Sequence, residues 1–215
     1  MGILRIDNHD IEEFITIKAR QKVLENFNIS VALTDKFMEA VNKNKNYHLI
    51  NPRTEAKVKD ENAGNIFELI CEIAWKTGDP GIIFIDRINK DNPTPKLGML
   101  ESTDSCGEQP LLPYEASNLG SINLSNMAKN EKIEFNKLKN IVHSAIHFLD
   151  NVIDMCHYPT PETREIVHAN RKVGLGVMGF AEMLIKLNIP YNSEKAVKTA
   201  ERIMAFIRKE ADNAS

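Results

Sequence analysis

The sequence has little cysteine and no long hydrophobic run. Three of its 215 residues are cysteines, and they form neither a Cys-x-x-Cys pair nor a paired Cys/His spacing, so no structural metal is expected. No apolar stretch approaches the ~20 residues that span a bilayer. The N-terminus, MGILRIDNHDIEEF, carries acidic residues where a signal peptide has a basic start and an apolar run. These absences predict a soluble, cytoplasmic protein without a membrane partner.

An excess of charge of either sign is also absent. The chain has 27 Lys and Arg residues against 30 Asp and Glu residues, a formal net charge of -3. This balance gives no broad electrostatic reason to bind nucleic acid. Hydrophobic residues make up 42% and charged residues 27% of the chain, an ordinary globular composition. The length suits one sizeable domain or two small ones.

Apolar spacing along the chain alternates between strand and helix patterns. Short β-branched or apolar runs predict strands at residues 4–7, 28–34, 81–87 and 121–127. Helical spacing with capping residues, such as Thr160 before Pro161, predicts helices at residues 11–27, 36–44, 60–77, 134–156, 160–171, 179–187 and 193–215. Because strands alternate with helices and no hairpin signal is visible, the sequence predicts an α/β fold with mostly parallel strand pairing.

The three cysteines lie in two kinds of sequence. Cys71 in NIFELICEIAW and Cys156 in FLDNVIDMCHY follow apolar helical patterns, which predict buried, inert thiols. Cys106 differs, because it lies in DSCGE, ahead of a proline-bounded stretch. In an extended segment, side chains two apart point the same way. Asp104, Cys106 and Glu108 are therefore expected on one face of a strand-like loop.

The acids beside Cys106 indicate a particular chemistry. Two carboxylates raise the pKa of the thiol and oppose the thiolate, and no histidine can be placed beside it as the base that a cysteine protease needs. A neutral thiol favours hydrogen-atom transfer through a sulfur radical, with Glu108 managing the proton of a substrate hydroxyl. The simpler alternative is a buried cysteine in a proline-rich connection, with Glu108 as a cap.

Two further motifs have structural explanations. Residues 174–179 satisfy Gly-x-Gly-x-x-Gly, which would suit a nicotinamide-dependent dehydrogenase. A charged helical stretch precedes them, however, and no acid ends a strand ~20 residues on. We interpret the glycines as sites of close helix packing or of a helix-entry turn. His143 and His147 have the i, i+4 spacing of a two-histidine metal site, but without a third ligand they indicate a polar helix edge.

Three longer stretches resemble one family. TGDPGIIFIDRINKDNPTPKLG, CGEQPLLPYEASNLGSINL and RKVGLGVMGFAEML closely resemble the catalytic (large) subunit of ribonucleotide reductase, nearest to its adenosylcobalamin-dependent class II form. The resemblance is collinear over essentially all 215 residues. It implies that residues 1–215 are a single partial domain, the central segment of a ten-stranded α/β barrel. In that barrel a finger loop carries the radical cysteine through the centre.

The resemblance also implies roles for individual residues. As a thiyl radical, Cys106 would take the 3′ hydrogen of a ribonucleotide, and Glu108 would accept the 3′-hydroxyl proton as the 2′-hydroxyl leaves as water. Such an enzyme reduces ribonucleotides to deoxyribonucleotides for DNA synthesis. Asp104 and Ser105 stand where the family usually has Asn, which helps to hold the substrate, and Pro. Ser117 stands where the family has one of two cysteines that supply reducing equivalents by forming a disulfide.

Cofactor and partners follow from the same resemblance. Adenosylcobalamin would be the radical source, without binding residues assignable in this chain, whereas a class I enzyme would take the radical from a separate metal-containing subunit. The substrate would be a ribonucleoside di- or triphosphate. The other redox cysteine and the loops that read nucleotide effectors are expected before Met1, and the phosphate-binding loop after Ser215. Complementary reductase segments or subunits would supply these parts, so the isolated chain is expected to be inactive.

A second hypothesis assigns the chain a non-catalytic function. The chain would then be a catalytically inactive or split fragment that acts as an assembly or interaction module. Asp104 and Ser117 favour this alternative, because a serine cannot form the family's disulfide and an acid replaces a neutral amide. Intact Cys106 and Glu108 oppose it.

Overall fold

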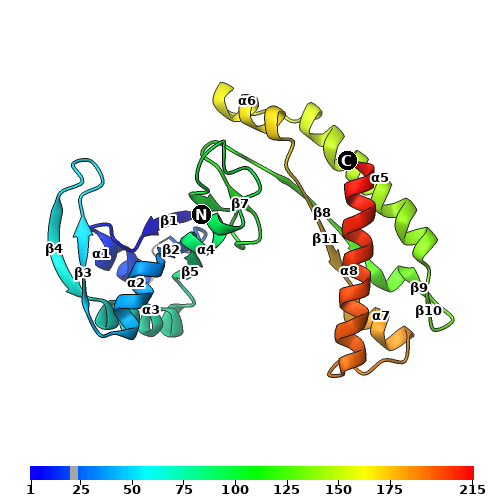
Figure 1. Ribbon diagram of the computed structural model, residues 1–215, viewed down its shortest axis with the longest axis horizontal. Helices are drawn as coiled ribbons and strands as arrows, with labels where there is room; N and C mark the ends of the chain where they lie inside the picture. Colours follow the sequence, from blue (N-terminus) through cyan, green and yellow to red (C-terminus); the bar gives the residue numbers. More distant parts are fainter. Residues whose placement is uncertain (20–23) are drawn as a thin grey trace. The chain divides into compact units, whose positions relative to one another are not determined.

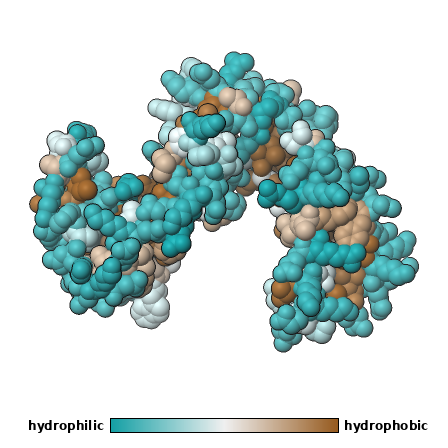
Figure 2. Space-filling model, viewed as in Figure 1, coloured by the Kyte–Doolittle hydropathy of each residue, from teal (hydrophilic) through white to brown (hydrophobic). Residues whose placement is uncertain are grey.

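The computed structural model describes residues 1–19 and 24–215 of the chain. Residues 1–113 form one unit and residues 114–215 a second (Figure 1). Both units contain helices and parallel strands, so the predicted α/β class is confirmed. Hydrophilic side chains cover most of the face that Figure 2 shows, and hydrophobic side chains gather there in separate patches.

A three-stranded parallel sheet is the centre of the first unit. Strand β2 (Ile29–Leu33) lies between β1 (Gly2–Arg5) and β5 (Gly81–Phe84). Every residue of β2 is buried, as expected for an apolar run that is covered on both faces. The three strands that the sequence predicts in this part of the chain therefore exist, with ends that differ by a few residues.

Helices pack against this sheet through their apolar faces. Helix α2 (Asp35–Asn42) begins where the side chain of Thr34 accepts a hydrogen bond from the Phe37 N–H, at 3.1 Å. The other helices of the unit are α1 (Ile11–Thr16), the 3-10 helix η1 (Ile17–Ala19), α3 (Ala63–Thr77) and α4 (Ile85–Lys90). The buried cluster consists of Ile6, Ile11, Ile15, Val31, Leu33, Phe37, Tyr47, Leu49, Ala63, Ile66, Ile70 and Ile73.

The helix expected over residues 11–27 is shorter than predicted. It ends at Thr16, and η1 follows it. Residues 20–23 of the expected helix lie outside the described residues, and residues 24–28 are not helical. Leu24 has a positive φ of 51°, which an α-helix does not accommodate. Leu24 and Phe27 are also exposed, so the apolar face that would have held this part of the helix is not buried.

An antiparallel pair was missed in the same unit. Strand β3 (Asn46–Ile50) pairs with β4 (Lys57–Asn62), so the helix predicted from residue 60 begins instead at Ala63. The sequence of β4 is KVKDEN, and most of it is exposed. An edge strand that is polar on both faces has no apolar alternation, which is the pattern that predicts a strand.

The second unit is built on two parallel strands. Strand β8 (Asn118–Asn123) pairs with β11 (Val173–Met178), with Asn118 opposite Val173. Helices α5 (Phe135–Met155) and α8 (Glu194–Ala214) pack on each other and close the core. Smaller elements of the unit are η2 (Leu124–Met127), β9 (Ala128–Lys129), β10 (Lys132–Ile133), α6 (Pro161–Asn170) and α7 (Phe180–Lys186).

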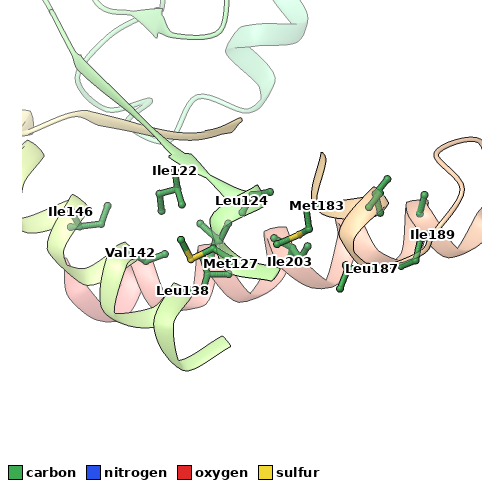
Figure 3. Packing of buried hydrophobic residues seen from close by; sticks show 13 residues of the cluster. Ile122, Leu124, Met127, Leu138, Val142, Ile146, Met183, Leu187, Ile189 and Ile203 are labelled. Carbon is green, nitrogen blue, oxygen red and sulfur yellow. The ribbon is translucent and has the colours of Figure 1, made fainter. Parts of the chain in front are cut away.

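The core of this unit draws on several elements. In Figure 3, Ile122 of β8 and Leu124 lie near side chains from α5, α7 and α8. The buried cluster consists of Ile122, Leu124, Met127, Leu138, Val142, Ile146, Met183, Leu184, Leu187, Ile189, Ala196, Ile203 and Ile207. In the part of the chain that the structure describes, no helix combines the length and apolarity needed to cross a membrane.

The glycine motif at residues 174–179 contributes a strand. Residues 174–178 belong to β11, which contacts helix α5, so the sequence missed a strand here. Gly179 has a φ of 69° and is the N-cap of α7, where an added Cβ would come within 2.2 Å of the Asn123 Oδ1 atom. The interpretation as a helix-entry turn is therefore confirmed for Gly179. The sequence did not predict strand β11 because glycine lacks the side chain that gives a strand its apolar alternation.

Candidate functional site

The segment around Cys106 is a hairpin. Strands β6 (Ser102–Thr103) and β7 (Pro110–Leu111) pair antiparallel, and residues 104–109 connect them. Gly107 has a φ of 85°, a conformation that glycine adopts without strain. The expectation of an extended segment with three side chains on one face is wrong, because the chain reverses direction between Asp104 and Gln109.

Asp104 closes this turn with its backbone and its side chain. Its N–H donates to the Gln109 carbonyl at 3.1 Å, and its own carbonyl accepts from the Gly107 N–H at 3.2 Å. The Asp104 Oδ1 atom accepts from the Gln109 N–H at 3.0 Å, and the Thr103 hydroxyl donates to the Asp104 carbonyl at 2.9 Å. Asp and Asn are both favoured in such turns because their side-chain oxygen can accept from the backbone. An asparagine could make the same contact.

Cys106 and Glu108 are exposed at the tip of the turn. The Cys106 Sγ atom lies 3.9 Å from the Ser105 Oγ atom. Cys71 and Cys156 are exposed as well, so the prediction that their thiols are buried is wrong. Cys71 lies off the buried face of α3, and Cys156 follows the last turn of α5. Exposure alone therefore does not distinguish Cys106, whereas its place in a tight turn does.

Ser117 lies in the second unit, immediately before β8. Its hydroxyl lies 3.2 Å from the Lys172 carbonyl and 3.2 Å from the Asn118 carbonyl, and donates toward them. Two residues earlier, the Glu115 side chain is fully buried. The Lys172 Nζ atom lies 2.6 Å from its Oε2 atom, and the Asn170 amide donates to its Oε1 atom at 2.8 Å. The sequence did not reveal this cluster, because Glu115 carries no signal for partners so far along the chain.

Arg171 joins the start of β11 to helix α5. It has a φ of 48° as the C-cap of α6. Its guanidinium donates to the Asp150 Oδ1 atom at 2.7 Å, and to the two carboxylate oxygens of Asp154 at 2.9 and 3.0 Å. Hydrogen bonds from Arg171 hold the pKa values of both carboxyl groups below their ordinary range.

The two histidines of α5 make ordinary polar contacts. The His143 Nε2 atom lies 2.9 Å from the Glu210 Oε2 atom, and Lys139 lies 3.2 Å from the same oxygen. These neighbours, His143 first, lower the pKa of Glu210. The His147 ring lies 3.2 Å from the Asn151 amide. Among the described residues, no group of three or more His, Cys, Asp or Glu side chains is arranged to hold a metal ion.

Comparison with known proteins assigns the family. The family model described as "Ribonucleotide reductase, barrel domain" matches residues 1–215. The chain belongs to the ribonucleotide reductase family. The resemblance found in the sequence is therefore confirmed.

Individual ribonucleotide reductases show the same relationship. The vitamin B12-dependent ribonucleoside-diphosphate reductase of Thermoplasma acidophilum is 50% identical over 217 residues, which is 100% of this chain and 28% of that protein. Its counterpart in Mycobacterium tuberculosis strain H37Rv is 47% identical over 216 residues, 100% of this chain and 31% of that protein. The ribonucleoside-diphosphate reductase subunit alpha of Chlamydia pneumoniae is 38% identical over 146 residues, 66% of this chain and 14% of that protein. The chain thus spans less than a third of each of these reductases.

Replacing Asp104 should loosen the hairpin of this reductase segment. In Asp104→Ala the Gln109 N–H loses its side-chain acceptor, a hydrogen bond worth about 1 kcal/mol. We expect this amide to exchange with solvent roughly fivefold faster. Hydrogen–deuterium exchange of the Gln109 amide measures the change. Asp104→Asn keeps the acceptor and is the matched control, and equal protection in both variants would contradict this assignment.

Replacing Arg171 should make the free energy of unfolding less sensitive to acid. The lowered pKa values of Asp150 and Asp154 stabilise the folded state above the unfolded-state pKa, about 4. This contribution is lost as the pH falls through the folded-state values. We therefore expect Arg171→Met to be less stable than the parent at pH 6, and the difference to shrink below about pH 4.

Urea unfolding of both proteins between pH 6 and pH 2.5 measures this difference. The control is Arg208→Met, which removes the surface pair of Arg208 with Asp212, at 83% and 67% side-chain exposure; such pairs contribute little. A parent–Arg171→Met difference that stays constant over the whole pH range would contradict the role given to Arg171.

Proposed function

We propose that this chain is the radical-cysteine segment of a vitamin B12-dependent ribonucleoside-diphosphate reductase, which reduces ribonucleotides to deoxyribonucleotides for DNA synthesis. The observation that carries the proposal is the match of the whole chain to the family together with 50% identity to a reductase of that name. In this proposal, residues 1–215 are a single partial domain of a ten-stranded α/β barrel. The hairpin of β6 and β7 corresponds to the finger loop of that barrel.

The residues at the turn would divide the chemistry between them. The Cys106 thiyl radical would take the hydrogen atom from C3′ of the substrate, forming the S–H bond and leaving a carbon radical. Glu108 would accept the 3′-hydroxyl proton, while the 2′-hydroxyl would take up a proton from the reducing dithiol of the reductase and leave as water. Both side chains are exposed at the tip of a short turn, which supports their meeting a substrate that other parts of the reductase hold. Asp104 would hold the turn and contact the substrate.

The cofactor and partners would act mainly outside this segment. Adenosylcobalamin supplies the initiating radical when it is bound to such a reductase. An exposed Cys106 thiol is compatible with a radical source that other segments hold, and none of the described residues is assigned to hold the corrin. The names of the relatives favour a ribonucleoside diphosphate as substrate. Complementary segments of the longer reductase would bind the nucleotide effectors and the substrate phosphates.

Removing the Cys106 thiol should abolish the radical step. In the full-length reductase that contains this chain, Cys106→Ser should lose exchange of tritium at the substrate 3′ position, because an O–H bond is too strong to take the place of the S–H bond. The exposed Cys71 and Cys156 offer matched controls, and Cys71→Ser and Cys156→Ser should retain the exchange. Exchange that persists in Cys106→Ser would remove this cysteine from its proposed role.

Ser117 favours a second candidate, an inactive or split fragment that acts as an assembly module. A serine cannot form the disulfide that the family uses at this position, and its hydroxyl already donates to the Lys172 carbonyl. The double variant Asp104→Asn, Ser117→Cys in the full-length protein separates the two candidates. If the chain is a reductase with altered residues, we expect dithiol-driven turnover to rise above that of the parent. No increase, with folding intact, would favour the assembly module.

A further inference from the structure

We propose that Glu115 is a positioning residue for the side chain at position 117 and acts on it through Lys172. The proposal rests on the proposed function in one respect, that residue 117 occupies the position of the reducing group. It concerns a different step from the one assigned to Cys106 and Glu108, because it affects how the reductase is re-reduced and leaves the radical step unchanged.

The burial of Glu115 is the first observation. Its side chain is 0% exposed and that of Lys172 is 15% exposed, with 2.6 Å between the Oε2 and Nζ atoms. The Asn170 amide donates to the other carboxylate oxygen at 2.8 Å. A buried carboxylate is strongly unfavourable unless charge and hydrogen bonds compensate for its lost hydration. Glu115 therefore holds residues 170 and 172 firmly in place before β11 begins.

The second observation is that Glu115 and Ser117 reach the same residue. They are two residues apart in the irregular segment before β8, and both contact Lys172. Glu115 binds the Nζ atom of Lys172, and the Ser117 hydroxyl donates to the Lys172 carbonyl at 3.2 Å. The acceptor for residue 117 thus belongs to the residue that Glu115 fixes.

A third contact holds the same backbone from the other side. Arg171, which lies between Asn170 and Lys172 in the sequence, binds Asp150 and Asp154 on α5. The Lys172 carbonyl is therefore tied both to the segment before β8 and to α5. The strand ladder begins only at the next pair, Asn118 with Val173, so these side chains determine the geometry at position 117.

The arrangement has a consequence for a thiol at position 117. A cysteine there would donate its S–H to the Lys172 carbonyl, and a hydrogen bond to the neutral form raises the pKa of the thiol. The Glu115 carboxylate also balances the Lys172 ammonium, which would otherwise favour the thiolate. Both effects keep the thiol protonated, and Glu115 contributes to both.

The test uses the full-length reductase carrying Ser117→Cys, with and without Glu115→Gln. Iodoacetamide alkylates the introduced thiol across a pH series, and peptide mass spectrometry reads position 117 separately from the other cysteines. We expect Glu115→Gln to lower the pKa of this thiol by about one unit, which makes alkylation near neutral pH about tenfold faster. An unchanged midpoint of the pH profile in the folded variant would overturn the proposal.

A matched control separates positioning from a general loss of stability. Glu210 is another buried carboxylate of this unit, at 7% side-chain exposure, and it binds Lys139 and His143. Glu210→Gln should leave the profile of the introduced thiol unchanged, and an equal shift in this variant would overturn the proposal. If Glu115→Gln does not fold, Asn170→Ala removes the amide contact to the Glu115 Oε1 atom while keeping the charge of Glu115. It should shift the profile in the same direction by a smaller amount, and no shift would again contradict us.

Catalytic measurements distinguish this proposal from the proposed function. In the Ser117→Cys background, Glu115→Gln should lower dithiol-driven turnover while tritium exchange at the substrate 3′ position stays the same. An equal loss of both would indicate a purely structural role and overturn the proposal. Absence of exchange in every variant, including the parent, would count against the proposed function. The alkylation profile would still decide the role of Glu115, because it needs no catalysis.

Discussion

The second unit depends on the parallel pairing of β8 and β11. Parallel strands need a long crossover, and here it contains α5 and α6. The crossover brings residues 117 and 172 together across 55 positions of sequence. The ion pair of Glu115 with Lys172 lies at the entrance of both strands, where no backbone ladder is yet available to align them. A slip of register by one residue moves every side chain of a strand to the opposite face of the sheet. Holding the first residues of both strands in place therefore determines which of their side chains face α5.

The hairpin of β6 and β7 imposes a different kind of constraint on Cys106. Its strands are too short to define the turn by themselves. The turn is instead defined by the contacts of Asp104, whose backbone and side chain together bind Gly107 and Gln109. A thiol at such a turn is held by a few local hydrogen bonds and not by core packing. Its environment therefore depends strongly on single residues near it.

The sequence predicted those elements whose pattern is set by burial or by local chemistry. Burial sets the apolar pattern of β2. Local chemistry sets the start of α6, where the Thr160 side chain accepts a hydrogen bond from the Thr163 N–H. Elements without such a pattern were missed, as β4 is polar and β11 is rich in glycine. The prediction that Cys71 and Cys156 are buried was wrong, because helical spacing alone does not show which of two neighbouring positions faces the core. The contacts of Glu115 could not be predicted, since they depend on pairing between distant segments.

Asp104 and Ser117, the two departures from the family pattern that the resemblance implies, can be compared through these contacts. Asp104 closes its turn through one carboxylate oxygen, and an asparagine oxygen can do the same. Ser117 donates to the Lys172 carbonyl, and a cysteine in its place would have the same acceptor. Neither substitution therefore requires a change of fold, and what each alters is chemical: a charge at position 104 and the ability to form a disulfide at position 117. Since the hairpin and the Glu115 cluster form with Asp104 and Ser117 in place, the fold accommodates both residues, and under the proposed function we expect each to act through its own chemistry and not through a change of structure.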